Sequence, residues 1–143
     1  MPYQFLEELA TADIAFRAWG VDLEELFVAC ADATANVMVE ELQSIEPRER
    51  RALACENEAL DLLLFDFLQE LIYYKDAEQL LLRVPEAEIQ KDSGQWKLKA
   101  VARGEKLDPK RHRQRVDVKA VTLHRFQLEQ TRDGWQAQVI LDI

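Results

Sequence analysis

The chain has 143 residues, of which 48% are hydrophobic and 31% are charged, and its formal net charge is -9. This composition is typical of one globular domain over residues 1–143 and excludes a disordered chain. The negative charge excludes a protein whose whole surface binds nucleic acid, because phosphate groups repel it. The charge is divided unevenly, since residues 1–100 sum to about -12 and residues 101–143 to about +3.

The N-terminal residues contain neither the basic segment nor the apolar run of a secretory signal. Cys30 and Cys55 are the only cysteines and lack metal-ligand spacing, so we expect two buried thiols in a reducing, cytoplasmic protein. Acidic residues interrupt the most apolar segment well before the roughly 20 residues that cross a membrane, so we expect no membrane partner.

The first third of the chain predicts two strands and a helix. Residues 3–6 and Ile14–Trp19 read as strands, and Gly20 ends the second one. Asp22 is followed three residues later by Glu25, an arrangement typical of a capping box at a helix start. The apolar residues that follow recur at helical spacing. The predicted buried stripe of this helix is Leu23, Leu26, Phe27, Cys30, Thr34, Val37 and Met38.

A second helix is predicted over Asn57–Asp76, after a loop at 46–51 and a short strand at 51–56. Asn57 is its predicted N-cap. Its apolar residues recur at i, i+3, i+4 and i+7, and Leu62, Phe65, Tyr73 and Tyr74 widen the stripe. The predicted exposed strip is Asp61, Asp66, Gln69 and Glu70. A helix that is apolar on most of its circumference must be covered on several sides, so we expect it at the centre of the fold.

After Asp76 the hydrophobic period changes from 3.6 to 2, which predicts strands. Residues 80–91 and 96–103 form a predicted hairpin around Asp92-Ser93-Gly94, and Pro85 requires an edge or a bulge in its first strand. Residues 104–115 are predicted to form a polar loop. Residues 116–130 and 135–143 form a second hairpin around Arg132-Asp133-Gly134. The prediction is an α+β fold, with two main helices packed on a largely antiparallel sheet with C-terminal hairpins.

The sequence contains no constellation typical of an enzyme. His112 and His124 are the only histidines, and neither has a Cys or His at zinc-ligand spacing. No serine lies in a Gly-x-Ser-x-Gly elbow, and the four glycines form no phosphate-binding loop. We interpret His112 as a loop residue without a pairing partner.

Lys110–Arg115 is the single basic cluster. Few aromatic residues flank it for base stacking, so we interpret it as a solvated loop that offsets nearby acids. Docking on the acidic patch of a partner protein, or on RNA held by that partner, is the alternative.

Two carboxylates have unusual surroundings. Asp13 begins a strand among small apolar residues, and Asp142 follows the apolar run Val139–Leu141. A carboxylate at the end of a core strand costs free energy unless it is solvated, paired or metal-bound. With the terminal carboxylate of Ile143, these oxygens could form a calcium- or magnesium-type site. The spacing alone does not establish that the two strand ends meet.

At these residues the chain resembles the archease family. Thr11-Ala12-Asp13-Ile14 matches the family's N-terminal motif, and Leu62–Asp76 resembles its long helix rich in leucine and aromatic residues. The remaining matching segments are Gly104-Glu105 with Asp108 and His112 in a loop motif, Val118-Lys119-Ala120-Val121-Thr122 with His124 in a signature strand, and Leu141-Asp142-Ile143 at the terminus. The match covers nearly the whole chain in the right order.

Archeases are small non-catalytic activators of the RtcB-type tRNA-splicing ligase. That enzyme is guanylylated from GTP with manganese and joins 2′,3′-cyclic- or 3′-phosphate ends to 5′-hydroxyl RNA. The resemblance implies that this chain promotes guanylylation and turnover of the ligase, to which GTP and manganese belong. It also implies a divalent metal, calcium in family terms, at Asp13, Asp142 and Ile143. Lys119, His124 and His112 are the implied partner-facing or site-adjacent residues.

The chain departs from the family pattern at two positions near the implied site. Leu9-Ala10 stands where the family usually has a histidine before Thr-Ala-Asp, and Leu123 stands where an aromatic residue is expected. Two other functions stay open. One is a metal-dependent phosphoester hydrolase that uses water activated at an Asp13/Asp142 cation. The other is a general chaperone without a dedicated client.

Overall fold

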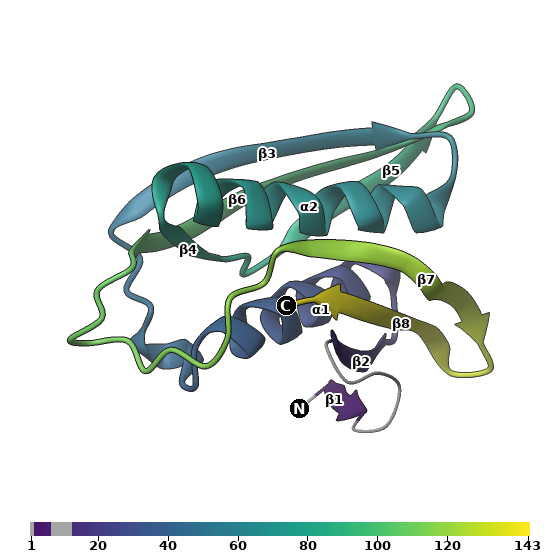
Figure 1. Ribbon diagram of the computed structural model, residues 1–143. Helices are drawn as coiled ribbons and strands as arrows, with labels where there is room; N and C mark the ends of the chain where they lie inside the picture. Colours follow the sequence, from purple (N-terminus) through teal and green to yellow (C-terminus); the bar gives the residue numbers. More distant parts are fainter. Residues whose placement is uncertain (1, 7–12) are drawn as a thin grey trace.

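The computed structural model describes residues 2–6 and 13–143 and contains two α-helices, a short 3-10 helix and eight strands (Figure 1). In chain order the elements are β1 (Tyr3–Leu6), β2 (Asp13–Gly20), α1 (Leu23–Met38), η1 (Leu42–Ser44), β3 (Glu49–Asn57), α2 (Leu60–Glu78), β4 (Leu80–Arg83), β5 (Ala87–Asp92), β6 (Gln95–Lys106), β7 (Ala120–Thr131) and β8 (Gly134–Asp142).

The strands form two antiparallel sheets rather than one. The first has the order β1-β2-β8-β7, and the second has the order β3-β6-β4 with β5 also pairing with β6. Helix α2 lies between the two sheets, and α1 packs on β2, β8, β4 and β5 (Figure 1). The predicted α+β class is confirmed, and the division into two sheets explains how α2 is covered on several sides.

Local sequence signals correctly located α1. The side chain of Asp22 accepts a hydrogen bond from the backbone N–H of Glu25 at 2.8 Å, and Glu25 accepts one from Val21 N–H at 3.1 Å. These contacts satisfy backbone donors that an uncapped helix start would leave unpaired. The predicted stripe is buried apart from Leu23, which is half-buried.

The start of α2 differs from the prediction. Asn57 is the last residue of β3, and Ala59 occupies the N-cap position. The Asn57 side chain instead accepts from Ala59 N–H and donates to Asp66, both at 3.0 Å, so it shapes the turn between strand and helix. Leu62 and Tyr73 are 36% and 57% exposed, and the buried stripe is therefore narrower than predicted. No helix in the described part of the chain is long and apolar enough to cross a membrane.

Several strand boundaries also differ. The predicted strand 80–91 is divided into β4 and β5 by Val84–Glu86, because Pro85 cannot donate to a ladder. Strand β6 continues to Lys106, so Gly104 and Glu105 belong to a strand and not to the predicted loop. A Cβ at Gly104 would lie 1.7 Å from the carbonyl oxygen of Leu81, so this close crossing requires glycine. Strand β7 begins at Ala120 instead of 116.

The two cysteines are free, and only one is fully buried. Cys30 lies in the core, whereas Cys55 is half-buried. The prediction of a buried thiol is therefore confirmed for Cys30 alone.

Candidate functional site

The ends of β2 and β8 meet at the two unusual carboxylates. Asp13 and Asp142 are directly paired across the antiparallel ladder. Directly opposed residues project to the same face of a sheet, with Cβ atoms about 5 Å apart. That face is the one turned away from the helices, because Ile14 and Leu141, the next pair along, pack on the core. Tertiary pairing therefore provides the juxtaposition that the sequence left open.

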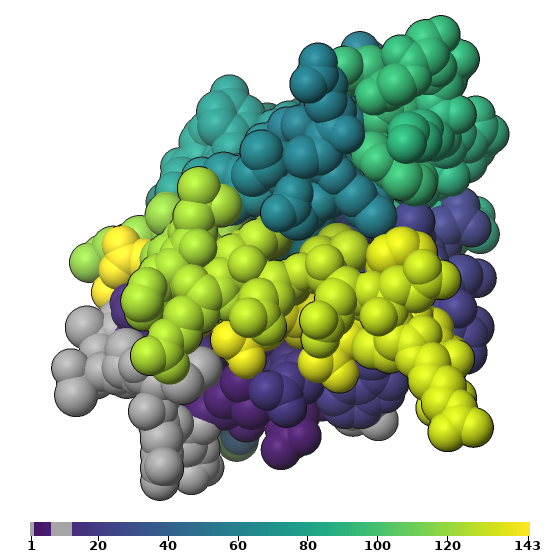
Figure 2. Space-filling view, turned by 90° about the vertical axis from the view of Figure 1, so that its right-hand side faces the viewer, coloured from purple at the N-terminus to yellow at the C-terminus, as the bar shows by residue number. Residues whose placement is uncertain are grey.

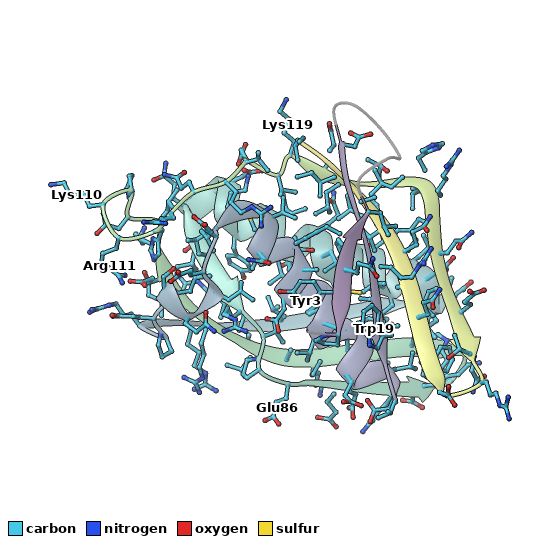
Figure 3. All side chains as sticks on the ribbon, turned by 90° about the horizontal axis from the view of Figure 1, so that it is seen from below. Tyr3, Trp19, Glu86, Lys110, Arg111 and Lys119 are labelled. Atoms are coloured by element: carbon cyan, nitrogen blue, oxygen red, sulfur yellow. The ribbon has the colours of Figure 1, made fainter. Side chains whose placement is uncertain are left out.

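Ile143 and Lys119 adjoin this pair. The side chain of Ile143 packs against the core, which holds the end of the chain beside Asp142. The backbone N–H of Lys119 donates to the carbonyl oxygen of Asp142 at 2.8 Å, and Ala120 is the ladder partner of Asp142. The exposed Lys119 side chain projects from this end of the molecule (Figure 3). Lys119 is thus adjacent to the carboxylates through its backbone.

The donors at this end suit a hard cation held partly by water. Among residues 2–6 and 13–143, no three His, Cys, Asp or Glu side chains cluster as a metal site would require. The sequence predicts the terminal carboxylate of Ile143, the residue after Asp142, as the other donor. Oxygen donors fit calcium or magnesium, whose remaining ligands water can supply, whereas zinc prefers nitrogen and sulfur. Thr11, Ala12 and the Leu9-Ala10 departure lie outside the described residues.

A buried lysine on α2 fixes the segment that leads into this site. Lys75 is 8% exposed, and its ammonium group donates to Asp76 and Asp117 at 2.5 Å each and to the carbonyl oxygen of Val118 at 2.7 Å. Burial acts to lower the pKa of Lys75, but the two carboxylates outweigh it and raise that pKa. Lys119 follows Val118 in the chain, and its backbone N–H is the one that donates to the carbonyl oxygen of Asp142.

Gln69 provides a second support from the same helix. Its side-chain oxygen accepts the backbone N–H of Val121 at 2.8 Å. Strand β7 is an edge strand of its sheet, so this donor has no ladder partner on that side. Gln69 is half-buried and bonded, and not the exposed residue that the sequence predicted. Helix α2 therefore positions the segment 117–121 without contributing a carboxylate to the site.

An irregularity in β7 exposes His124. Thr122 pairs with Ile140 and Gln127 with Gln138, so four residues of β7 oppose one of β8, and Arg125 has a φ of 52°. His124 is exposed there, and Leu123 is 59% exposed. Strand β7 occupies much of the surface shown in Figure 2. Leu123 and His124 are therefore open to solvent at this irregularity.

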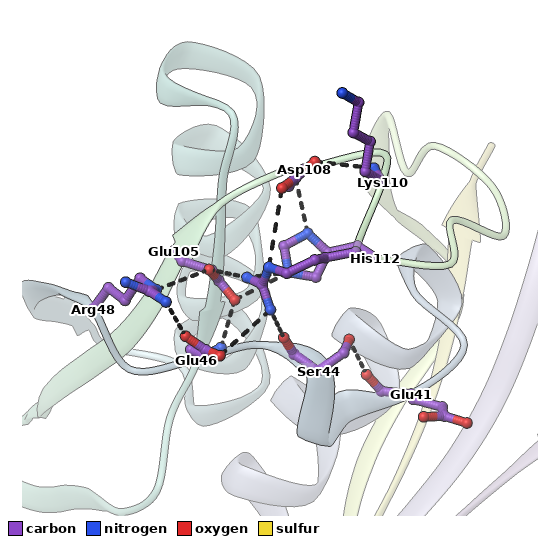
Figure 4. Close-up of polar contacts among 9 residues, drawn as sticks. Glu41, Ser44, Glu46, Arg48, Glu105, Asp108, Lys110 and His112 are labelled. Atoms are coloured by element: carbon purple, nitrogen blue, oxygen red, sulfur yellow. Dashed lines mark hydrogen bonds and ion pairs between the residues drawn. The ribbon is translucent and has the colours of Figure 1, made fainter.

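Glu105 organises a second polar cluster, in the motif Gly104-Glu105…Asp108…His112 (Figure 4). Its carboxylate is 5% exposed and accepts hydrogen bonds from the backbone N–H of Glu46 at 2.7 Å, from Arg111 and from His112 Nε2 at 3.1 Å. This cluster joins the end of β6 to the loop that follows it.

His112 is a buried member of that cluster, so its interpretation as an unpaired loop residue is wrong. The residue is 2% exposed, and its Nδ1 accepts the backbone N–H of Asp108 at 2.8 Å. The proton must then lie on Nε2, which donates to Glu105. Because the ring is enclosed, His112 supports the loop and does not present its side chain to a partner.

The stability of this cluster depends on the charge of Glu105. Burial acts to raise the pKa of Glu105, but the hydrogen bonds from Glu46 N–H, Arg111 and His112 outweigh it and lower the pKa to about 2. A lowered folded-state pKa stabilises the protein above the unfolded-state pKa of about 4.3, and that contribution is lost as the pH falls toward the folded value. We therefore expect the free energy of unfolding to fall between about pH 4.5 and pH 2.

Replacing Glu105 with Gln tests this cluster. The neutral amide cannot replace an ionised acceptor, so we expect the free energy of unfolding to fall by about 2 kcal/mol at neutral pH. We also expect this free energy to change less between neutral and acidic pH than it does in the wild type. Urea unfolding of the wild type and of Glu105→Gln at about pH 7 and pH 3 measures both effects. Glu129→Gln, at an exposed position in β7, is the control. If the free energy of unfolding fell by the same amount from pH 7 to pH 3 in the wild type and in Glu105→Gln, the role assigned to the Glu105 charge would be contradicted.

The basic run Lys110–Arg115 is largely held by the protein itself. Arg111 binds Glu105 and lies 3.6 Å from Glu46, and Arg113 lies 3.7 Å from Glu40. The Arg115 side chain donates to the carbonyl oxygen of Asn36 at 3.3 Å and stacks over the Phe5 ring. These contacts agree with a loop that offsets nearby acids. Contact of this run with RNA stays a prediction.

The family model for the Archease protein family matches residues 3–143. The chain belongs to the archease family. A protein archease from Pyrococcus abyssi is 44% identical over 134 residues, covering 93% of this chain and 94% of that protein. A protein archease from Methanopyrus kandleri is 36% identical over 144 residues, covering all of both chains.

Two solved structures have the same fold. The solution structure of protein 1598 from Methanobacterium thermoautotrophicum has a TM-score of 0.85, 33% identity and 99% coverage of each chain. The crystal structure of an archease from Thermotoga maritima, described as a possible chaperone, has a TM-score of 0.60 over 94% of this chain and 93% of that one. At 20% identity, this second likeness shows the archease fold alone.

Two residues near this candidate site were not predicted from the sequence. Lys75 continues the helical spacing of Leu71 and Ile72, a signal that could have identified it as a buried lysine. Thr122 shares the face of Asp142, and its hydroxyl is buried without a hydrogen-bond partner in the described residues. A buried hydroxyl without a partner is costly, which makes Thr122 a further candidate for this end of the sheet.

Proposed function

We propose that this archease is a non-catalytic accessory protein that promotes guanylylation and multiple turnover of an RtcB-type tRNA-splicing RNA ligase. The observation that carries the proposal is the pairing of Asp13 with Asp142. It brings Asp13 and Ile14 of the N-terminal motif, the signature strand at Lys119 and the terminal Leu141-Asp142-Ile143 to one end of one sheet. Family membership supports an accessory role, and ligase activation at that end is part of the proposal.

The proposed cation is calcium, held by Asp13, Asp142 and the terminal carboxylate of Ile143. These residues fit it because they supply only oxygen donors and two adjacent negative charges that repel each other in its absence. Bound there, it would offset these charges and could accept an oxygen of a partner's phosphate or nucleotide as a further ligand. The metal and the partner are parts of the proposal.

The residues of the chain suggest how a ligase would be engaged. The carboxylate pair lies at strand ends, where a partner can reach it, and Lys119 adds an exposed cation next to it. His124 and Leu123 offer exposed side chains on the neighbouring strand. We infer that this edge binds beside the active site of the ligase, whose own GTP and manganese carry out the chemistry. RNA contact would be indirect or through Lys110–Arg115.

The test measures guanylylation and joining by the RNA ligase of the same organism, with labelled GTP and a broken RNA bearing a 2′,3′-cyclic phosphate. We expect that this archease in catalytic amounts accelerates guanylylation and converts a single round of joining into many. Unchanged guanylylation and turnover at every ratio of the two proteins would refute the proposal. Chelator-sensitive phosphoester hydrolysis by the purified archease alone would favour the hydrolase alternative instead.

A further inference from the structure

A groove of about 1030 Å³ runs beside α1, past the break between β4 and β5, and onto the outer face of β6 and β3. Its floor is built from apolar residues, most of which are small. These include Val28 and Ala29 of α1, Pro85 between the strands, Ala52 and Leu53 of β3, and Ala100 and Val101 of β6. It includes none of Asp13, Asp142 and Ile143, so it is a separate surface from the proposed cation site.

The sheet register explains why the groove is open. Strand β6 pairs first with β5 and then with β4 on the same side. Ala100 is opposite Ala87 of β5, and Arg103 is opposite Arg83 of β4. Neither β4 nor β5 supplies a ladder partner for Val101 and Ala102. The chain leaves the sheet at Pro85 because proline lacks the N–H that pairing would need. This gap lets the groove pass from the helix side to the outer face.

The rim of the groove is strongly acidic. Six acidic side chains line it, against two basic ones, Lys99 and Arg103. Internal contacts occupy several of the acids, since Asp32 binds Arg83 at 3.0 Å, Asp22 caps α1 and Glu24 accepts the backbone N–H of Ile89.

Glu86 and Glu88 are the exposed acids at the break. Glu86 projects outward (Figure 3), and it has no ion pair or hydrogen bond within residues 2–6 and 13–143. Glu88 accepts only from Gln90 in that part of the chain. Lys99, the ladder partner of Glu88, forms no ion pair with it within residues 2–6 and 13–143. A positively charged partner would therefore meet the two carboxylates beside an apolar floor.

We propose that this groove binds an extended segment of the ligase that carries lysine and arginine side chains, a proposal that rests on the proposed function. An enzyme that holds RNA needs a basic surface, and an acidic rim is complementary to it. The small residues of the floor leave space for a chain in extended conformation. The aliphatic parts of the lysine and arginine side chains of that segment can pack on the floor. The same rim repels RNA itself. Complementary charge of this kind steers association and selects the partner.

The test compares two double charge reversals. Glu86→Lys with Glu88→Lys changes the groove, and Glu129→Lys with Asp133→Lys makes the same change in net charge at the β7–β8 hairpin, whose turn projects at one corner of Figure 2. Calorimetry with the purified ligase measures the dissociation constant at about 50 mM and about 300 mM salt, since screening weakens such contacts. We expect the groove variant to bind at least about tenfold more weakly at low salt and the control to change less than about threefold.

Each outcome decides the proposal. Equal weakening by both variants would show that only the overall field matters, and wild-type affinity of the groove variant would show that the ligase binds elsewhere. In both cases the proposed function stands as long as the wild type stimulates the ligase. No binding or stimulation by the wild type would instead overturn the proposed function, and the groove proposal with it. Self-association of the wild type that the groove variant loses would identify a second copy as the occupant and overturn the assignment to the ligase.

Discussion

Replacing Asp13 and Asp142 together with Asn is expected to abolish calcium binding and reduce ligase stimulation to the level without this protein. The variant keeps the shape of both side chains and removes two of the three negative donors. Calcium binds through ionised oxygens, so we expect an affinity loss of at least about 100-fold. Titration calorimetry measures the metal, and guanylylation with labelled GTP measures the activity.

The fold should survive this double replacement. Both side chains are half-buried at strand ends, and their removal also relieves the repulsion between two adjacent like charges. Thermal unfolding without calcium should therefore change little. Glu129→Gln with Asp133→Asn, in β7 and in the turn after it, is the matched control. If the Asp13/Asp142 variant still binds calcium, the proposal that calcium binds at this edge is contradicted.

Replacing Lys75 with Met is expected to destabilise the protein and weaken the same site from a distance. The variant leaves the carbonyl oxygen of Val118 without its buried donor and frees Asp76 and Asp117. We expect a loss of about 3 kcal/mol in the free energy of unfolding, because several charge-assisted hydrogen bonds are lost together. The segment 117–121 should loosen where Lys119 binds Asp142, and calcium affinity should fall about tenfold.

A stability effect and a positioning effect have different readouts. Urea unfolding without calcium measures the first, and calorimetry at low temperature, where the variant is folded, measures the second. Lys110→Met removes an exposed lysine and should change neither quantity. Full calcium affinity in folded Lys75→Met would show that α2 does not position the site.

The helices are the elements that local patterns predicted best. Both were expected from apolar residues at helical spacing, and the Asp22/Glu25 cap of α1 appears in the structure. A helix forms its backbone hydrogen bonds within one segment, so its sequence carries most of the necessary information. The prediction that Asn57 is the N-cap of α2 was wrong because β3 continues to Asn57, which therefore ends a strand.

The strands were harder to delimit because their partners lie far away in the sequence. Strand β6 extends through Glu105 since β3 and β4 both pair with its end, and no local pattern specifies that. This extension places Glu105 where His112 can reach it, which explains why the loop prediction missed the pair. The late start of β7 has the same origin, because Lys75 and Gln69 of α2 hold the residues before and at its beginning.

The sequence by itself determined the chemistry of this protein: an acidic α+β chain, two carboxylates at strand ends, and motifs that identify the archease family. Only the tertiary structure decided that Asp13 and Asp142 face each other and that His112 is enclosed. It also decided that an acidic groove opens at Pro85. The physical reason is that residue type fixes which bonds a side chain can make. Strand register and helix packing fix which side chains meet, and these depend on contacts between segments far apart in the chain.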